Sequence, residues 1–179
     1  MTIGARFFTL LCLAAAAMLP LVAVAHAPLQ VGEPAPAFTL PDADGKAHQV
    51  GEWRGHWLVL YFYPRDDTPG CTAEAQNFRD SLPAFAAANA RIVGISLDDG
   101  ASHRAFADKQ HLPFTLLSDP GGTVAERYGS LTNLGIMHFA KRQTYLIDPE
   151  GLVAKVYLKV DPAEHVQQLL ADIRSLASP

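Results

Sequence analysis

Residues 57–80 decide the fold of this chain, and they read WLVLYFYPRDDTPGCTAEAQNFRD. Residues 57–63 form a continuous apolar run, which is typical of a strand covered on both faces of a sheet. Thr68 is suited to the N-cap of a following helix, and Pro69 to its first position, because a proline there gives up no helical hydrogen bond. The stretch therefore predicts a strand, a short loop and a helix whose third residue is Cys71.

The predicted place of Cys71 in the first turn of a helix favours the reactive form of its thiol. The N–H groups of that turn have no partner within the helix, and the positive end of the helix dipole stabilises a negative charge. We therefore expect the thiolate, which is the nucleophilic form. Thr68 lies three residues earlier, the spacing of a capping box, so its hydroxyl is placed to hydrogen-bond the sulfur or a ligand beside it. The alternative, an inert cysteine that fills the core, is disfavoured by both features.

The pattern P-x-x-x-T-x-x-C, formed by Pro64, Thr68 and Cys71, resembles the active-site signature of the peroxiredoxins. Its continuation over residues 70–80, GCTAEAQNFRD, is similar to the subgroup called peroxiredoxin Q or bacterioferritin comigratory protein. The similarity of pattern covers roughly residues 30–175. The resemblance implies a thioredoxin-like fold and a thiol peroxidase.

The resemblance also implies a mechanism in which Cys71 attacks hydrogen peroxide or an organic hydroperoxide and becomes a sulfenic acid. Thr68 would help to hold the peroxide, and Pro64 would shield the sulfur from water. Many members of the subgroup carry a resolving cysteine five residues after the reactive one, and here that position is Gln76. The sulfenic acid would then be reduced by an external thiol, such as glutathione or a glutaredoxin-like or thioredoxin-like protein.

Arg142 resembles the family arginine that reaches the reactive sulfur from a neighbouring strand. It directly precedes a predicted strand over residues 143–148, and a guanidinium there would favour the thiolate and bind a peroxide oxygen. Lys141 and Arg65 are alternatives for the same role. Glu74, one turn beyond the cysteine, would either orient the arginine or favour the N-terminus of the helix.

Composition limits the other functions of the chain. It has 179 residues, 49% of them hydrophobic, and a net charge of −4, which fits one globular domain. No basic patch is visible, so we expect no nucleic-acid binding. None of the seven histidines is followed by another at a distance of four residues, and no glycine-rich phosphate loop is present. We therefore expect neither a metal nor a cofactor.

Residues 1–25 have the composition of a secretory signal. Arg6 is their only charge, and they end in the small-x-small motif of residues 23–25. Cleavage there would leave residues 26–179 as one exported domain without a membrane segment, in the periplasm of a bacterium. The alternative is an uncleaved anchor, because the apolar run is nearly long enough to span a bilayer.

Cleavage would also remove Cys12 and leave Cys71 as the single thiol. A mature chain with one cysteine cannot form an internal disulfide, so its fold depends on its core alone. Oxidation could still link two chains through Cys71, so we expect a monomer or a homodimer.

Periodicity and turn residues predict the remaining elements. In chain order they are a hairpin over residues 38–50, a strand over 92–97, a helix over 102–112, a strand over 114–117, a helix over 123–128, a loop over 130–141, a hairpin of 143–148 with 152–158, and a last helix that starts at Asp161. Pro83 is expected to kink the helix that begins before Cys71. This order predicts an α/β fold, a mixed central sheet with helices on both faces.

Two other functions are compatible with such a fold. A thiol-disulfide oxidoreductase usually needs a second cysteine in C-x-x-C, whereas Cys71 is followed by Thr72, Ala73 and Glu74. A binding or holdase protein that lost turnover is the non-enzymatic alternative. Peroxide consumption separates it from a peroxidase.

Overall fold

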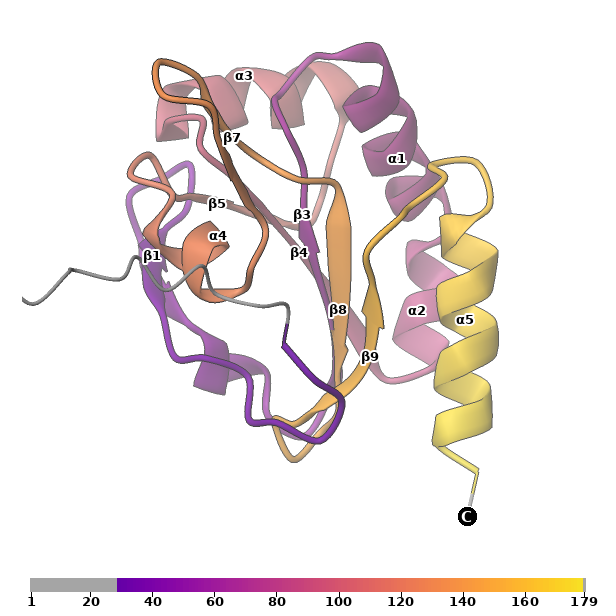
Figure 1. Ribbon diagram of the computed structural model, residues 1–179. Helices are drawn as coiled ribbons and strands as arrows, with labels where there is room; N and C mark the ends of the chain where they lie inside the picture. Colours follow the sequence, from indigo (N-terminus) through magenta and orange to yellow (C-terminus); the bar gives the residue numbers. More distant parts are fainter. Residues whose placement is uncertain (1–28, 179) are drawn as a thin grey trace, which may run out of the picture.

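A mixed five-stranded sheet forms the centre of the computed structural model, which describes residues 29–178 (Figure 1). Its strand order is β5-β4-β3-β8-β9. The strands are β3 (Trp57–Phe62), β4 (Ala90–Ser96), β5 (Thr115–Ser118), β8 (Gln143–Ile147) and β9 (Val153–Tyr157). β4 pairs parallel with β3 and β5, whereas β8 pairs antiparallel with β3 and β9. The predicted mixed sheet is confirmed.

Helices cover both faces of this sheet, also as predicted (Figure 1). One face is packed against four helices, α1 (Pro69–Asp80), α2 (Leu82–Ala87), α3 (Gly100–Gln110) and α5 (His165–Leu176). The other face is packed against helix α4 (Thr123–Arg127), the short helix η1 (Val50–Trp53) and the predicted N-terminal hairpin of β1 (Thr39–Pro41) and β2 (Ala47–Gln49). Helix α1, which carries Cys71, lies on the four-helix face.

Strand β3 is apolar throughout because both of its faces are buried. Val59 and Tyr61 belong to the hydrophobic core on the four-helix face, whereas Leu60 and Phe62 belong to the core on the opposite face. Gly94 of β4 is the register partner of Tyr61, and a Cβ atom at this glycine would come within 2.7 Å of the tyrosine ring. The glycine therefore makes room for a large aromatic ring in the layer beneath α1.

The predicted loop over residues 130–141 is wrong. This segment forms a second hairpin, in which β6 (Leu131–Asn133) pairs antiparallel with β7 (His138–Ala140). Gly135 has a φ of 78° in the connection, a conformation that suits glycine. The strands are only three residues long and most of their side chains are partly or fully exposed, so the sequence shows no alternation of apolar and polar residues.

The helix predicted to kink at Pro83 is instead two helices. α1 ends at Asp80, α2 begins at Leu82, and Ser81 between them caps both. Pro83 lies in the first turn of α2, where its missing N–H costs no hydrogen bond.

The last helix begins one turn later than predicted. Asp161 was expected to be its N-cap, but α5 starts at His165 and Glu164 occupies the cap position. The carbonyl of Asp161 accepts hydrogen bonds from the N–H groups of Glu164 (3.2 Å) and His165 (3.0 Å), so residues 161–164 form a turn that leads into the helix. Of the apolar face predicted for this helix, Val166, Leu169, Leu170 and Ile173 are buried as expected. The prediction is wrong for Leu176, which lies in the last turn and is 47% exposed.

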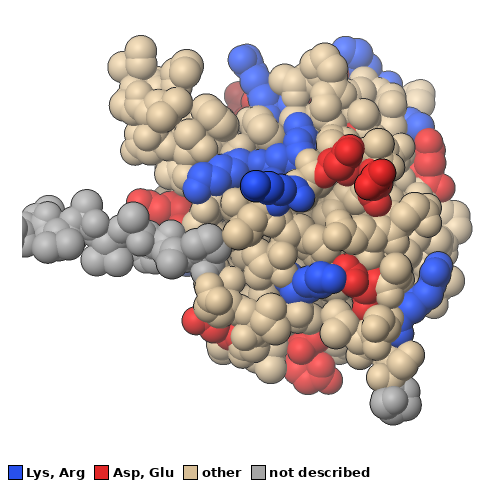
Figure 2. Space-filling view, turned by 45° about the vertical axis from the view of Figure 1, so that its right-hand side comes forward, with Lys and Arg blue, Asp and Glu red and all other residues tan. Residues whose placement is uncertain are grey.

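The predicted secretory signal, residues 1–25, lies outside the described residues. Among the helices of residues 29–178, none has the length and apolar character needed to cross a bilayer. Figure 2 shows basic side chains gathered in a band across the upper part of one face, with acidic side chains beside them.

Candidate active site

Cys71 lies in the first turn of α1, beside the carboxyl end of β3. The helix begins at Pro69 with Thr68 as its N-cap residue, so Cys71 is its third residue, as predicted. The side chain is 2% exposed and belongs to the core on the four-helix face. Within residues 29–178 it is the only cysteine, and its thiol is free.

The guanidinium of Arg142 contacts the sulfur of Cys71. Its Nη2 atom lies 3.2 Å from Sγ, although the two residues are 71 positions apart in the chain. Arg142 directly precedes β8, and the first residue of β8 is the register partner of Phe62 at the end of β3. Antiparallel pairing therefore brings the arginine to the end of β3 where the cysteine loop begins.

Two neighbouring features explain why Arg142 and not another cation reaches the sulfur. Gly70 has no side chain, and a Cβ atom there would lie 3.1 Å from the Nη2 atom of Arg142. Lys141 donates to the carbonyl of Gly129 at 3.1 Å, and Arg65 is exposed to solvent. Of the three cations considered from the sequence, the structure places Arg142 at the cysteine.

Glu74 binds the same guanidinium from the other side. It lies one turn beyond Cys71 on α1, is 1% exposed, and its Oε2 atom accepts a hydrogen bond from Nη1 of Arg142. Burial raises the pKa of Glu74 to about 7, against the opposing effect of the Arg142 charge. Burial lowers the pKa of Arg142, but the negative charges of Glu74 and Cys71 outweigh it and hold the pKa above its usual value. Arg142 is therefore a permanent cation between two acidic groups.

The hydroxyl of Thr68 donates a hydrogen bond of 3.0 Å to the carbonyl of Arg65 and does not cap the helix. The carbonyl of Thr68 accepts the first helical bond, from the N–H of Thr72 at 2.8 Å. Because the hydroxyl proton is used within the loop, the oxygen keeps its lone pairs for a donor such as a protonated ligand.

Pro64 is half-buried at the end of β3, beside a surface groove of about 580 Å³. Residues from the β3–α1 loop, the β4–α3 connection and the β6–β7 hairpin line this groove, namely Pro64, Arg65, Leu97, Asp98, Ile136, Met137, His138 and Phe139. The groove thus opens next to the loop that carries Thr68 and leads to Cys71.

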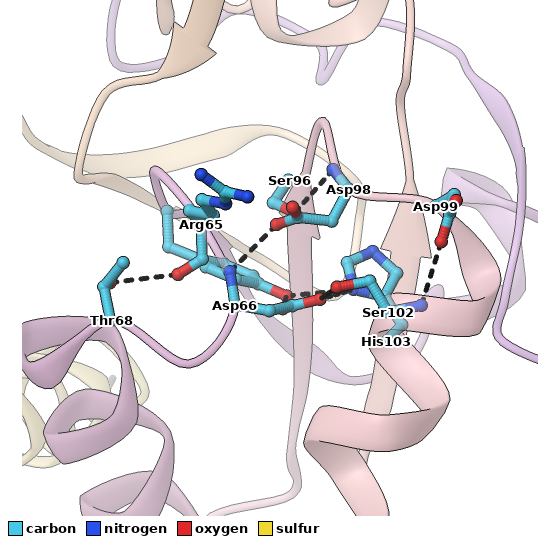
Figure 3. Close-up of polar contacts among 9 residues, drawn as sticks. Arg65, Asp66, Thr68, Ser96, Asp98, Asp99, Ser102 and His103 are labelled. Atoms are coloured by element: carbon cyan, nitrogen blue, oxygen red, sulfur yellow. Dashed lines mark hydrogen bonds and ion pairs between the residues drawn. The ribbon is translucent and has the colours of Figure 1, made fainter.

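Sequence reasoning missed a buried polar cluster around Asp66 in the same loop (Figure 3). Asp66 is 7% exposed and is bound to His103 of α3. The two adjacent aspartates of the loop between the buried strand and the helix were the available signal in the sequence. His103, the partner of Asp66, is 37 residues away in the chain, so the contact could not be read locally. Among residues 29–178, no three His, Cys, Asp or Glu side chains are grouped closely enough to bind a metal ion.

Comparison with known proteins identifies the family of the chain. Residues 31–156 match the AhpC/TSA family. The chain belongs to this family. It is 44% identical over 146 residues to the chloroplastic peroxiredoxin Q of Populus jackii, a match that covers 81% of this chain and 68% of that one. It is 42% identical over 148 residues to a putative peroxiredoxin bcp of Coxiella burnetii, with 79% and 97% covered.

Solved structures of AhpC/TSA proteins share the fold. Peroxidoxin BcpB from Mycobacterium tuberculosis is 35% identical with a TM-score of 0.79, and the match covers 84% of this chain and 99% of that one. Peroxiredoxin Q of Xanthomonas campestris is 35% identical with a TM-score of 0.74, with 79% and 92% covered. The chain is therefore a thioredoxin-fold peroxiredoxin of the Q group, a thiol-dependent peroxidase. The alternatives of a thiol-disulfide oxidoreductase and of a holdase are not favoured.

Proposed function

We propose that Cys71 is the peroxide-reducing residue of this peroxiredoxin and that Arg142, Thr68 and Pro64 complete its catalytic site. The observation that carries the proposal is the contact of 3.2 Å between the Arg142 guanidinium and the Cys71 sulfur at the start of α1. A cation and a helix N-terminus both favour the thiolate, and they meet here at the single cysteine of residues 29–178.

The thiolate of Cys71 attacks the terminal oxygen of hydrogen peroxide or an organic hydroperoxide. A sulfur–oxygen bond forms, the oxygen–oxygen bond breaks, and its electron pair leaves with the second oxygen, which takes up a proton and departs as water or an alcohol. The sulfur is oxidised to a sulfenic acid as the peroxide is reduced.

Arg142 stabilises the charge that moves from the sulfur to the leaving oxygen. Its guanidinium offers five N–H donors in a fixed plane, and contacts to Glu74 and Cys71 leave others for the two peroxide oxygens. The Thr68 oxygen accepts a hydrogen bond from the O–H of the bound hydroperoxide through its free lone pairs, and Pro64 limits the access of water to the sulfur.

The groove beside Pro64 supports the inclusion of organic hydroperoxides. Its lining includes Leu97, Ile136 and Met137, and the side chain of Ile136 is 99% exposed. An organic substituent on the leaving peroxide oxygen would find apolar contacts there. The Xanthomonas campestris bacterioferritin comigratory protein, 34% identical to this chain, is described as having alkyl peroxide reduction activity.

An external thiol reduces the sulfenic acid. Gln76, at the position of a resolving cysteine in many relatives, donates to the side-chain oxygen of Gln110 on α3 at 2.8 Å and offers no sulfur. Two thiols are needed, because the first forms a mixed disulfide with Cys71 and releases water, and the second resolves that disulfide. Glutathione, a glutaredoxin-like or a thioredoxin-like protein would serve.

The composition of residues 1–25 supports export, with residues 26–179 as the mature domain in a bacterial periplasm. A mature chain with one thiol fits a monomer or a homodimer, without a bound membrane or nucleic acid.

Peroxide consumption by residues 26–179 tests the proposed function. With dithiothreitol present, the wild-type protein should consume hydrogen peroxide or cumene hydroperoxide, and Cys71→Ser should not. A dimedone-type reagent should label the peroxide-treated wild type and spare the variant. Equal consumption or equal labelling in the two proteins would contradict the proposal.

A further inference from the structure

The loop of residues 64–68 decides where Cys71 and Thr68 lie, because it joins the end of β3 to the start of α1. Asp67 in this loop has a φ of 56°, a left-handed conformation that is uncommon outside glycine and that aspartate tolerates better than most residues. A conformation of this kind persists when neighbouring contacts hold it in place.

The side chain of Asp66 provides such contacts (Figure 3). Its Oδ1 atom accepts a hydrogen bond from the hydroxyl of Tyr63 at 2.8 Å. Its Oδ2 atom accepts one from the hydroxyl of Ser102 at 2.7 Å and lies 2.9 Å from Nδ1 of His103. Because a carboxylate only accepts, Nδ1 of His103 is the donor. Three side chains, one from the residue that directly follows β3 and two from α3, thus fix one buried carboxylate of the loop.

The main chain of Asp66 is tied to the same region. Its N–H donates to Oδ2 of Asp98 at 2.9 Å, and this atom also accepts from the hydroxyl of Ser96 at 2.7 Å. The carboxylate of Asp66 meets Ser102 and His103 in the first turn of α3, where the helix dipole favours a negative charge. Both the side chain and the backbone of Asp66 therefore hold the cysteine loop against the β4–α3 connection.

Asp66 carries its charge at neutral pH despite its burial. Burial raises the pKa of its carboxyl, but the hydrogen bonds from His103, Ser102 and Tyr63 outweigh this and lower the pKa on balance. Hydrogen bonds to a charged group are stronger than those between neutral groups, so the cluster is a firm anchor.

We propose that Asp66 is a positioning residue for the peroxide reaction: its anchored carboxylate holds the Thr68 hydroxyl and the start of α1 where the Cys71 sulfur and Arg142 can act on one peroxide. This inference rests on the proposed function. Asp66 has no contact with Cys71 among the hydrogen bonds of residues 29–178, so it acts through the loop. It is one of several loop contacts, which include Thr68 with the carbonyl of Arg65.

Two reactions of the same sulfur separate positioning from thiolate formation and from folding. Oxidation by hydrogen peroxide needs the Thr68 hydroxyl and the Arg142 guanidinium correctly positioned around the Cys71 sulfur. Alkylation by iodoacetamide needs only an accessible thiolate. In Asp66→Asn, an amide N–H₂ faces donors that formerly met a carboxylate. We expect its second-order rate constant for peroxide oxidation to fall by about tenfold or more and its alkylation rate to change by less than about threefold.

Two substitutions of His103 test whether its Nδ1–H donor is needed to hold the carboxylate of Asp66. His103→Asn places an amide N–H near the former Nδ1 position, and His103→Leu has a similar size but no donor. We expect His103→Asn to keep most of the peroxide rate and His103→Leu to lose it. Ser102→Ala removes only the hydrogen bond to Asp66 and replaces the other variants in the test if these do not fold. We expect its peroxide rate to fall by more than about twofold.

Asp42→Asn is the matched control, because it alters a histidine–aspartate contact of the same length, 2.9 Å to His48, on the N-terminal hairpin. It should leave both rates unchanged. Three results would overturn the inference. The first is a peroxide rate within twofold of wild type in folded Asp66→Asn or Ser102→Ala. The others are an equal fall in the rates of peroxide oxidation and alkylation, and equal peroxide rates in the two His103 variants. Failure of wild type itself to react with peroxide would instead overturn the proposed function.

Discussion

The guanidinium that contacts the Cys71 sulfur is held from behind by Glu74. Arg142 places Nη2 at 3.2 Å from the sulfur and donates through Nη1 to the Glu74 carboxylate, both on the first two turns of α1. The cation therefore has a fixed orientation set by the helix that carries the cysteine. A lysine in its place would carry the charge but lose that orientation, so a comparison of arginine with lysine tests whether the orientation matters.

Replacement of Arg142 should slow peroxide reduction. We expect Arg142→Ala to lower the rate constant for peroxide oxidation by about 100-fold, because it removes both a charge and the donors for the transition state. Arg142→Lys should recover only part of this loss, since a single ammonium cannot reach the sulfur and Glu74 in a fixed plane. Stopped-flow measurement of sulfenic acid formation checks both variants.

Lys141→Ala is the control, because Lys141 is adjacent in sequence and donates to the carbonyl of Gly129 rather than to the site. Its rate should match wild type. A normal rate in Arg142→Ala with a slow Lys141→Ala or Arg65→Ala would transfer the role to one of those cations.

Glu74 should make the protein less stable as the pH rises toward neutrality. Burial raises the pKa of Glu74 in the folded state to about 7 from 4.5, so between these values the folded state holds a proton that the unfolded state has lost. Stability from this group is therefore greatest below pH 4.5 and is lost as the pH rises through about 7, by up to about 3 kcal/mol.

Urea unfolding of wild type and Glu74→Gln between pH 5 and pH 8 measures this effect, since the variant cannot ionise. The free energy of unfolding should fall with pH more steeply in wild type than in Glu74→Gln. Parallel curves for the two proteins would contradict the raised pKa.

His165 should act in the opposite sense in acid. Burial lowers its pKa from 6.5 to about 4, although Gln168 and Asp172 oppose this shift. Between pH 6.5 and pH 4, His165 is protonated in the unfolded chain but neutral in the folded protein. The free energy of unfolding therefore falls as the pH drops from 6.5 to 4, by up to about 3 kcal/mol. His165→Gln can keep the contact of the Nε2 atom with the Thr144 hydroxyl, 2.8 Å in the structure, without titrating.

The difference in unfolding free energy between pH 7 and pH 5 should therefore be smaller in His165→Gln than in wild type. An unchanged pH dependence in His165→Gln would show that another group carries the acid sensitivity.

Local rules in the sequence correctly predict where Cys71 lies in its helix. The continuous apolar run, the N-cap Thr68 and the proline at the first helical position place Cys71 third in its helix, as in the structure. The contact with Arg142 follows from the antiparallel register of β8 against β3, which no local pattern contains, so the family resemblance was needed to suggest it.

The sequence could not predict features that depend on distant or exposed segments. The hairpin of β6 and β7 is held by backbone pairing between largely exposed strands, so no apolar pattern marks it. The anchor of Asp66 on His103 joins residues after β3 and β4, whose carboxyl ends meet because these strands are parallel. Parallel pairing therefore predicts that the connections after β3 and β4 lie side by side. It does not predict which of their residues form hydrogen bonds with each other.

The last prediction concerns regeneration of Cys71. Because no other cysteine lies in residues 26–179, wild type given excess peroxide without a thiol should consume about one equivalent per chain in a single burst, and sustained turnover should require an added thiol. An internal disulfide in the oxidised wild type, or turnover without a thiol, would contradict this.

Gln76→Cys tests whether the first turns of α1 can open. A thiol five residues further along a helix lies about 7.5 Å away along the axis, and disulfides rarely join Cα atoms more than about 7 Å apart. Gln76 is also held to Gln110 of α3, which links this part of α1 to its neighbour. An internal disulfide should therefore form in the variant only if α1 unwinds locally. After one equivalent of peroxide, loss of both free thiols with no intermolecular product would demonstrate that opening, whereas a persistent sulfenic acid and one remaining thiol would show that the helix stays closed.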